Sequence, residues 1–114
     1  MIDEETISEF LRNGVVLLKK IIEPSWVLEL QKGVDFNFKY PSKYKCVYEK
    51  NENKEIFYDD YCNWSRIKEY KNFIFNSNIS KIASLLMNSR KVNLFHEHVL
   101  IKEKGSKKRT PWHQ

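Results

Sequence analysis

Hydrophobic side chains recur at helical spacing in four stretches of the chain, which predicts four amphipathic helices. In the first stretch, Ile7, Phe10 and Leu11 share one face, and Asn13-Gly14 is a typical helix stop. Pro24 suits the first turn of the second helix, because proline lacks the N–H that is unpaired there. The expected helices span residues 3–12, 24–36, 63–75 and 79–88.

Other stretches have the patterns of strands. Residues 15–18 are a continuous apolar run (Val-Val-Leu-Leu), typical of a buried strand. Residues 44–48 and 56–58 are β-prone and flank a polar turn, which favours a hairpin. A long strand is expected over 92–102, and Pro111 opens what reads as the start of another. Helices and strands in this order predict the α+β fold class.

Composition narrows the class of protein. The chain has 114 residues, of which 41% are hydrophobic and 14% aromatic, so it suits one ordered domain or part of one. No apolar run approaches the roughly 20 residues that cross a bilayer. The first residues are acidic where a signal peptide would be basic. These features predict a cytoplasmic protein with no membrane partner.

The positive charge is concentrated in one place. The net charge is +5, and residues 102–109 contain five basic residues against Glu103, a local net charge of +4. The basic excess therefore belongs to one loop, and a face that binds nucleic acid is not predicted. Cys46 and Cys62 lack the spacing of a zinc or redox motif, so both are expected to be reduced thiols.

The three histidines fall within 18 residues and provide the candidate chemistry. On a strand, His96, His98, Leu100 and Lys102 would share one face, because alternate side chains point the same way. Two histidines at alternate strand positions can chelate one metal ion, although ordinary hydrogen-bonded histidines would give the same pattern. A zinc site formed by His96, His98 and His113 is a further alternative.

His113 belongs to a second pattern. A histidine followed two residues later by a carboxylate supplies two of the three ligands of the facial triad in non-haem Fe(II) oxygenases. The sequence ends at Gln114, one residue before the position of that carboxylate.

The residues around these histidines resemble a known family. The segments Leu94-Phe95-His96-Glu97-His98-Val99-Leu100-Ile101-Lys102-Glu103-Lys104-Gly105 and Thr110-Pro111-Trp112-His113-Gln114 are similar to the phytanoyl-CoA dioxygenase family. Members of that family carry a strand of the type Phe-His-Asp-His, then Lys-Glu-Pro-Gly, a variable loop and Thr-Pro-Trp-His-Gln-Asp. Here Lys104 stands where proline is common. Residues 10–18, 21–30 and 57–64 resemble the earlier parts of the family more loosely.

The resemblance implies an Fe(II)- and 2-oxoglutarate-dependent dioxygenase that uses O2 to hydroxylate a small organic substrate. It implies a double-stranded β-helix, a jelly-roll or cupin-like fold, of which residues 1–114 would be the N-terminal portion, with the helices and first strands in one truncated domain. His113 would be an iron ligand. His98 and Lys102 would border the 2-oxoglutarate pocket, and Trp64 and Arg66 would lie near the co-substrate or substrate.

The remaining ligands implied by the resemblance, an Asp, a distal His and an Arg that pairs with 2-oxoglutarate, would follow Gln114. A single histidine cannot hold iron against water, so we expect residues 1–114 alone to be inactive. The alternative from another class is a non-catalytic interaction domain. In that alternative the loop 102–109 would bind an acidic partner or nucleic acid, and His113 would be structural.

Overall fold

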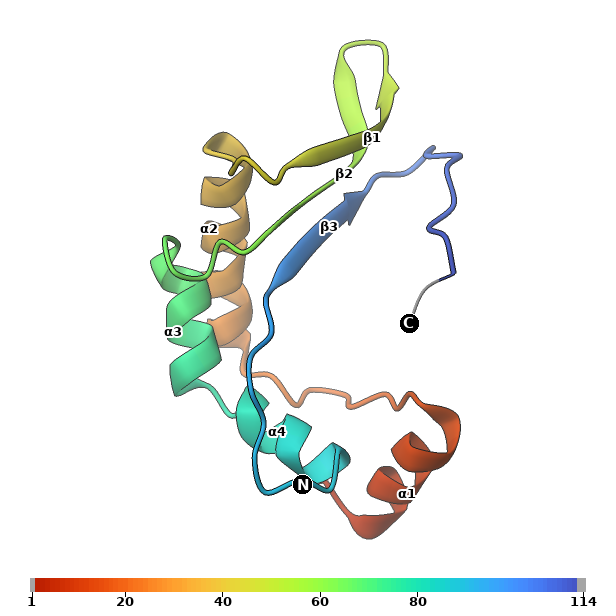
Figure 1. Cartoon of the computed structure of the whole chain (residues 1–114), viewed down its shortest axis with the longest axis vertical. Coiled ribbons are helices and arrows are strands. Elements are labelled where there is room, and N and C mark those ends of the chain that lie inside the picture. Colours follow the sequence, from red (N-terminus) through yellow and green to blue (C-terminus); the bar gives the residue numbers. More distant parts are fainter. Residues whose placement is uncertain (1, 113–114) are drawn as a thin grey trace.

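The computed structural model describes residues 2–112, which form four α-helices and a three-stranded antiparallel sheet (Figure 1). This content confirms the α+β class. The elements are α1 (Glu4–Asn13), α2 (Pro24–Lys39), β1 (Cys46–Asn51), β2 (Lys54–Tyr61), α3 (Lys68–Asn76), α4 (Ile79–Leu86) and β3 (His98–Lys102). His113 lies outside the described residues. No helix within residues 2–112 combines the length and apolar character needed to cross a membrane.

The ends of α1 lie close to where the sequence places them. The Asp3 side chain accepts a hydrogen bond from the Thr6 N–H at 2.9 Å, which caps the start of the helix. Gly14 ends it in the left-handed conformation, with φ of 71°, and donates its N–H to the Phe10 carbonyl at 2.8 Å. α2 begins at Pro24 as predicted and continues three residues beyond Phe36, to Lys39.

The hairpin predicted around the polar turn is confirmed as β1 and β2. The two strands are joined at Glu52 and Asn53, so the turn is shorter than the sequence suggests and β2 is longer. β2 is the central strand, with β1 on one side and β3 on the other. In the β2–β3 pair, Phe57 lies opposite Lys102 and Tyr61 lies opposite His98.

The expectation of a buried strand over residues 15–18 is wrong. Val15 is 68% exposed and Leu17 is 76% exposed, and the segment pairs with no strand in the part of the chain that the structure describes. The apolar run favours burial, but a strand also requires a hydrogen-bonded neighbour, and the segment has none within residues 2–112.

Three further boundaries differ from the prediction. The strand expected over 92–102 begins only at His98, because β2 ends at the opposite residue, Tyr61. No strand begins at Pro111 within the described residues. α3 begins at Lys68 instead of residue 63, because residues 63–67 form a turn that precedes the helix.

The packed interior is small and lies mainly where α2 meets α3 and where α2 reaches the sheet, with further buried apolar residues on α4 (Ile82) and on the opposite face of β2 (Phe57). Gly33 of α2 lets the ring of Tyr70 approach closely, since a Cβ at residue 33 would stand 2.7 Å from Tyr70 Cε1. Phe38 meets Tyr58 of β2 edge-on, with 4.8 Å between ring centroids. The buried apolar residues are Ile56, Phe57, Ile67, Tyr70 and Ile82.

Candidate functional site

Two adjacent carboxylates on β2, Asp59 and Asp60, are buried on opposite faces of the sheet. They are 2% and 0% exposed, respectively. Aspartate is uncommon in strands and rarely buried without partners, so each carboxylate needs an explanation. Their hydrogen bonds differ, and the difference separates a structural cluster from a candidate site.

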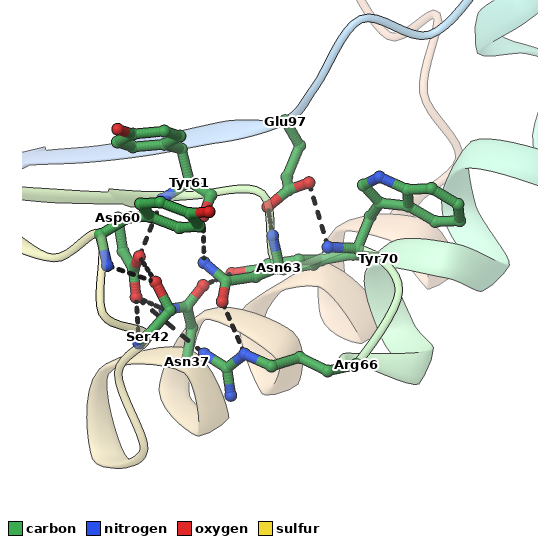
Figure 2. Close-up of polar contacts among 10 residues, drawn as sticks. Asn37, Ser42, Asp60, Tyr61, Asn63, Arg66, Tyr70 and Glu97 are labelled. Carbon is green, nitrogen blue, oxygen red and sulfur yellow. Dashed lines mark hydrogen bonds and ion pairs between the residues drawn. The ribbon is translucent and has the colours of Figure 1, made fainter.

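Asp60 faces α2 and is fully hydrogen-bonded (Figure 2). Its carboxylate accepts from Asn37 Nδ2 at 2.8 Å, from the Ser42 N–H at 2.8 Å and from Ser42 Oγ at 2.5 Å. Asn37 in turn accepts from the Tyr70 hydroxyl at 3.2 Å. Burial alone would raise the pKa of Asp60, but the hydrogen bonds from Ser42 and Asn37 outweigh it and leave the pKa below its ordinary value. Such a satisfied carboxylate joins α2 to the sheet and is structural.

The turn before α3 is attached to the same cluster through Glu97. The Glu97 carboxylate accepts from the backbone N–H groups of Asn63 and Trp64, the latter at 3.0 Å. Arg66 Nε donates to Asn63 Oδ1 at 2.6 Å, and Arg66 Nη2 lies 4.0 Å from Asp60 (Figure 2). Burial raises the pKa of Tyr70, and the nearby charges of Glu97 and Asp60 raise it further.

Asp59 faces the other side of the sheet and is only partly hydrogen-bonded. Its Oδ2 accepts from the Tyr48 hydroxyl at 2.6 Å and lies 2.8 Å from His98 Nε2. Its Oδ1 is buried and has no hydrogen-bond partner among residues 2–112. The hydrogen bond to Asp59 is the main cause that raises the pKa of Tyr48, with burial and the charge of Asp59 adding to it. We call Tyr48, Asp59 and His98 the triad.

Aromatic rings and one lysine surround the triad. Tyr61 lies 5.5 Å from the His98 ring and stacks on Tyr44 at 4.9 Å, both measured between ring centroids. The Lys102 ammonium lies 5.1 Å from the centroid of the Phe57 ring, on the opposing strand. The His98 side chain is 43% exposed, so one edge of the triad is open to a ligand.

The structure brings together only some of the predicted site residues. His98 and Lys102 lie on the same face of β3, as the alternation predicts. Trp64 and Arg66 lie instead in the turn after β2, where Arg66 binds the Asp60 side of the sheet and the Trp64 ring packs edge-on against Phe75 at 5.7 Å. These two residues are therefore tied to a different cluster from His98 and Lys102.

The described residues do not form a complete metal site. In the described part of the chain, no three His, Cys, Asp or Glu side chains gather closely enough to hold a metal ion. The rings of His96 and His98 are 6.2 Å apart, and His113, the predicted iron ligand and the third residue of the alternative zinc site, is not among the described residues. Cys46 and Cys62 are free thiols and exposed.

The basic loop is held to the sheet by Glu49 of β1. The Glu49 carboxylate accepts from Ser106 Oγ at 2.6 Å and from the backbone N–H groups of Lys107 and Lys108, each at 3.0 Å. These three hydrogen bonds, from Ser106 first, lower the pKa of Glu49 to about 2. The loop is therefore ordered through its backbone, while Lys107 and Lys108 themselves are exposed.

Sequence reasoning missed Asp59, Asp60 and Glu97. One signal was present: the run Tyr58-Asp59-Asp60-Tyr61 places two acidic residues inside a β-prone segment, where exposed turns would ordinarily carry them. Apart from the Tyr61 N–H, which donates to the adjacent Asp60, the hydrogen-bond partners of these carboxylates are 11 to 39 positions away in the chain, so no local pattern identifies them.

The chain was compared with protein-family models, curated proteins and solved structures, and none of the three comparisons found a match.

Proposed function

We propose that residues 1–114 form the N-terminal portion of a cytoplasmic Fe(II)- and 2-oxoglutarate-dependent dioxygenase that hydroxylates a small organic substrate. The fold proposed for the whole enzyme is a double-stranded β-helix of the kind found in the phytanoyl-CoA dioxygenase family. The support from the sequence is the resemblance of residues 94–105 and of Thr110-Pro111-Trp112-His113-Gln114 to that family.

One structural observation carries the proposal. The two faces of the sheet differ: the Asp60 side is attached to α2, whereas the opposite side presents two ionisable groups, His98 in contact with Asp59 and Lys102 over the Phe57 ring. A sheet that encloses a site in a jelly roll needs this arrangement, with one face on supporting helices and one face toward the ligand. β3 then continues into the loop that leads to His113.

The described residues fit part of the chemistry and not all of it. Lys102 is a cation on the open face and suits a carboxylate of 2-oxoglutarate. Iron is a different matter, because the described residues contain no three-ligand group. In the proposed enzyme, His113 would supply one ligand and residues beyond Gln114 the others. We therefore assign no chemical step through iron to this part of the chain.

The test uses the protein that contains this chain together with whatever follows it in the reading frame. We expect Asp directly after Gln114, and Fe(II)-dependent release of succinate from 2-oxoglutarate by the purified protein. His113→Ala should abolish the release, while Lys102→Met should raise the KM for 2-oxoglutarate. A reading frame without that Asp, or succinate release that is unaffected by His113→Ala, would rule the proposal out.

A second candidate function has one observation in its favour. Glu49 orders the backbone of the basic loop while leaving Lys107 and Lys108 exposed, which presents fixed positive charge on the surface. An interaction domain that binds an acidic partner could use such a loop. Salt-dependent binding of the 114-residue chain to heparin, lost when Lys107 and Lys108 are both changed to Gln, would favour this function. We rank it second because the loop charge is local and no wider basic face accompanies it.

A further inference from the structure

The hydrogen bonds of the triad determine which nitrogen of His98 carries a proton. A carboxylate can only accept hydrogen bonds, so His98 Nε2 must be the donor in its 2.8 Å contact with Asp59. In the neutral ring the other nitrogen, Nδ1, is then an acceptor. His98 Nδ1 can therefore accept a hydrogen bond from a donor on a ligand that approaches the open face of the sheet.

Asp59 is poorly explained as a residue that stabilises the fold. Its neighbour Asp60 uses both carboxylate oxygens in hydrogen bonds, as buried carboxylates usually do. Asp59 is 2% exposed, yet both of its hydrogen bonds involve Oδ2, and Oδ1 has no partner in the described chain. A buried carboxylate that leaves an oxygen unpaired is costly. The role that its geometry does support is to hold the imidazole of His98.

His98 and Lys102 lie apart along β3, and their side chains contact different neighbours. They are four positions apart on β3, which corresponds to about 13 Å along a strand. The Lys102 ammonium also lies over Phe57, the residue directly across from it, and does not lean toward His98. Lys102 is therefore placed against Phe57 and His98 against Asp59, and we treat His98 as a separate contact point that a second molecule can use.

The surroundings of His98 indicate the shape of that molecule. Tyr61 lies directly opposite His98 in the sheet, and the Tyr61 ring is stacked against Tyr44, which is 40% exposed. Stacked rings provide a flat apolar surface that suits another ring. A ligand that uses both features would carry a ring for the tyrosines and a hydrogen-bond donor for His98 Nδ1.

We propose that His98 binds the hydroxyl group of a ring-containing organic molecule, which packs on Tyr61 and Tyr44, and that Asp59 is the positioning residue that fixes the imidazole for this contact. The identification of this molecule as the substrate to be oxidised rests on the proposed function. The binding site itself does not, because its test needs neither iron nor 2-oxoglutarate.

The first measurement is made on the unmodified 114-residue chain. The 15N chemical shifts of a histidine ring report which nitrogen carries the proton, and they can be recorded at about pH 8, where histidine is ordinarily neutral. We expect His98 to be in the Nε2–H form. We expect Asp59→Asn to give a mixture of the two forms, whereas Tyr48→Phe should leave the Nε2–H form in place. An Nδ1–H form, or a mixture in the unmodified chain, would overturn the proposal.

The second measurement uses two probes that differ in one hydrogen-bond donor. Phenol has a ring and a hydroxyl, and anisole has the same ring with the hydroxyl methylated. In NMR titrations we expect phenol to shift the His98 Nδ1 signal saturably and to bind about fivefold more tightly than anisole, the ratio given by one hydrogen bond. His98→Asn should remove the difference between the probes. Because His98 supplies one of the two hydrogen bonds to the buried Asp59, circular dichroism of the variant must first show that the fold is kept.

His96 provides the matched control, because it is a neighbouring histidine with no hydrogen bond to a carboxylate among the described residues. His96→Asn should leave the preference for phenol unchanged. Equal binding of phenol and anisole, or a preference that survives His98→Asn, would show that His98 makes no such contact. Failure here with normal succinate release would overturn only this inference. A preference for phenol without succinate release would support the binding site at His98 and refute the proposed dioxygenase function.

Discussion

Glu49 on β1 and the backbone N–H of Lys108 are 59 positions apart in the chain and are joined by a 3.0 Å hydrogen bond. The same carboxylate binds Lys107 N–H and Ser106 Oγ, so a single side chain fixes the basic loop against the hairpin. The contact explains how eight residues with a local net charge of +4 can adopt a defined path beside the sheet.

The first prediction concerns the pH dependence of this contact. The folded-state pKa of Glu49 is about 2, below its ordinary value of 4.5, so its contribution to loop order is present above 4.5 and is lost as pH falls toward 2. Amide hydrogen exchange at Lys107 and Lys108, corrected for the intrinsic effect of pH, should lose protection in that window. Glu49→Gln should weaken the protection at neutral pH and make it independent of pH over the same range. Unchanged protection in Glu49→Gln would contradict the assignment.

The second prediction concerns Gly33. An alanine in the middle of a helix is ordinarily favoured over glycine by about 1 kcal/mol. Here its Cβ would lie 2.7 Å from the buried Tyr70 ring, whose hydroxyl is bound to Asn37 and cannot easily move. We expect Gly33→Ala to destabilise the chain by about 1–2 kcal/mol in urea unfolding, because overpacking outweighs the helical gain.

The control for Gly33 is a double-mutant cycle. In a Tyr70→Ala background the obstructing ring is absent, so Gly33→Ala should become neutral or stabilising. The same loss of stability with and without the ring would show that the close approach to Tyr70 is not the cause.

The sequence predicted the helices better than the sheet, and the reason is physical. The amphipathic spacing of α1 and the stop at Gly14 depend on residues within four positions of one another, so they can be read locally. Strand limits depend on pairing. The length of β3 is set by where β2 ends, at Tyr61, and residues 15–18 have strand-like composition but no neighbour in the described chain.

The candidate site divides in the same way. Alternation along the strand correctly placed His98 and Lys102 on one face of β3. It could not reveal that Asp59, 39 positions earlier, would contact His98, since that depends on the β2–β3 register. Nor could the sequence show that Arg66 is engaged by Asn63 and faces Asp60, on the other side of the sheet.

The third prediction concerns Asp60 and the dependence of the unfolding free energy on pH under acidic conditions. The pKa of Asp60 is lowered in the folded chain, so the carboxylate contributes stability above its ordinary pKa of 3.8 and loses that contribution as pH falls through the lowered folded value. Asp60→Asn should cost about 2–3 kcal/mol at neutral pH, because a buried charged acceptor and its hydrogen bonds are lost. The unfolding free energy of the variant should also depend less steeply on pH below 3.8.

Ser42→Ala is the graded control for that experiment. It removes the Oγ hydrogen bond and keeps the one from the Ser42 N–H, so we expect a loss of about 1 kcal/mol. Equal losses in Ser42→Ala and Asp60→Asn would mean that the carboxylate charge contributes little.

The fourth prediction concerns the second edge of β3, which pairs with no strand in the part of the chain that the structure describes. The Glu103 N–H and the Glu97 carbonyl both form hydrogen bonds with β2 or the residue that follows it. Backbone groups alternate in direction along a strand, so those of the odd-numbered residues between them face β2. The backbone groups of Leu100 therefore point to the free edge. An unpaired edge of this kind promotes association between chains. We expect the weight-average molar mass of the 114-residue chain, measured by light scattering, to rise above that of the monomer as protein concentration increases.

Two proline variants at adjacent positions distinguish the free edge of β3 from the edge that is hydrogen-bonded to β2. Leu100→Pro removes an outward N–H and should reduce association while β3 remains in the sheet, since proline is tolerated on the free side of an edge strand. Val99→Pro removes an N–H that faces β2 and should detach β3, which near-ultraviolet circular dichroism of the tyrosines would report. If both variants associate as strongly as the unmodified chain and keep its spectrum, the contact between chains is made by another surface, such as the exposed Val15 and Leu17.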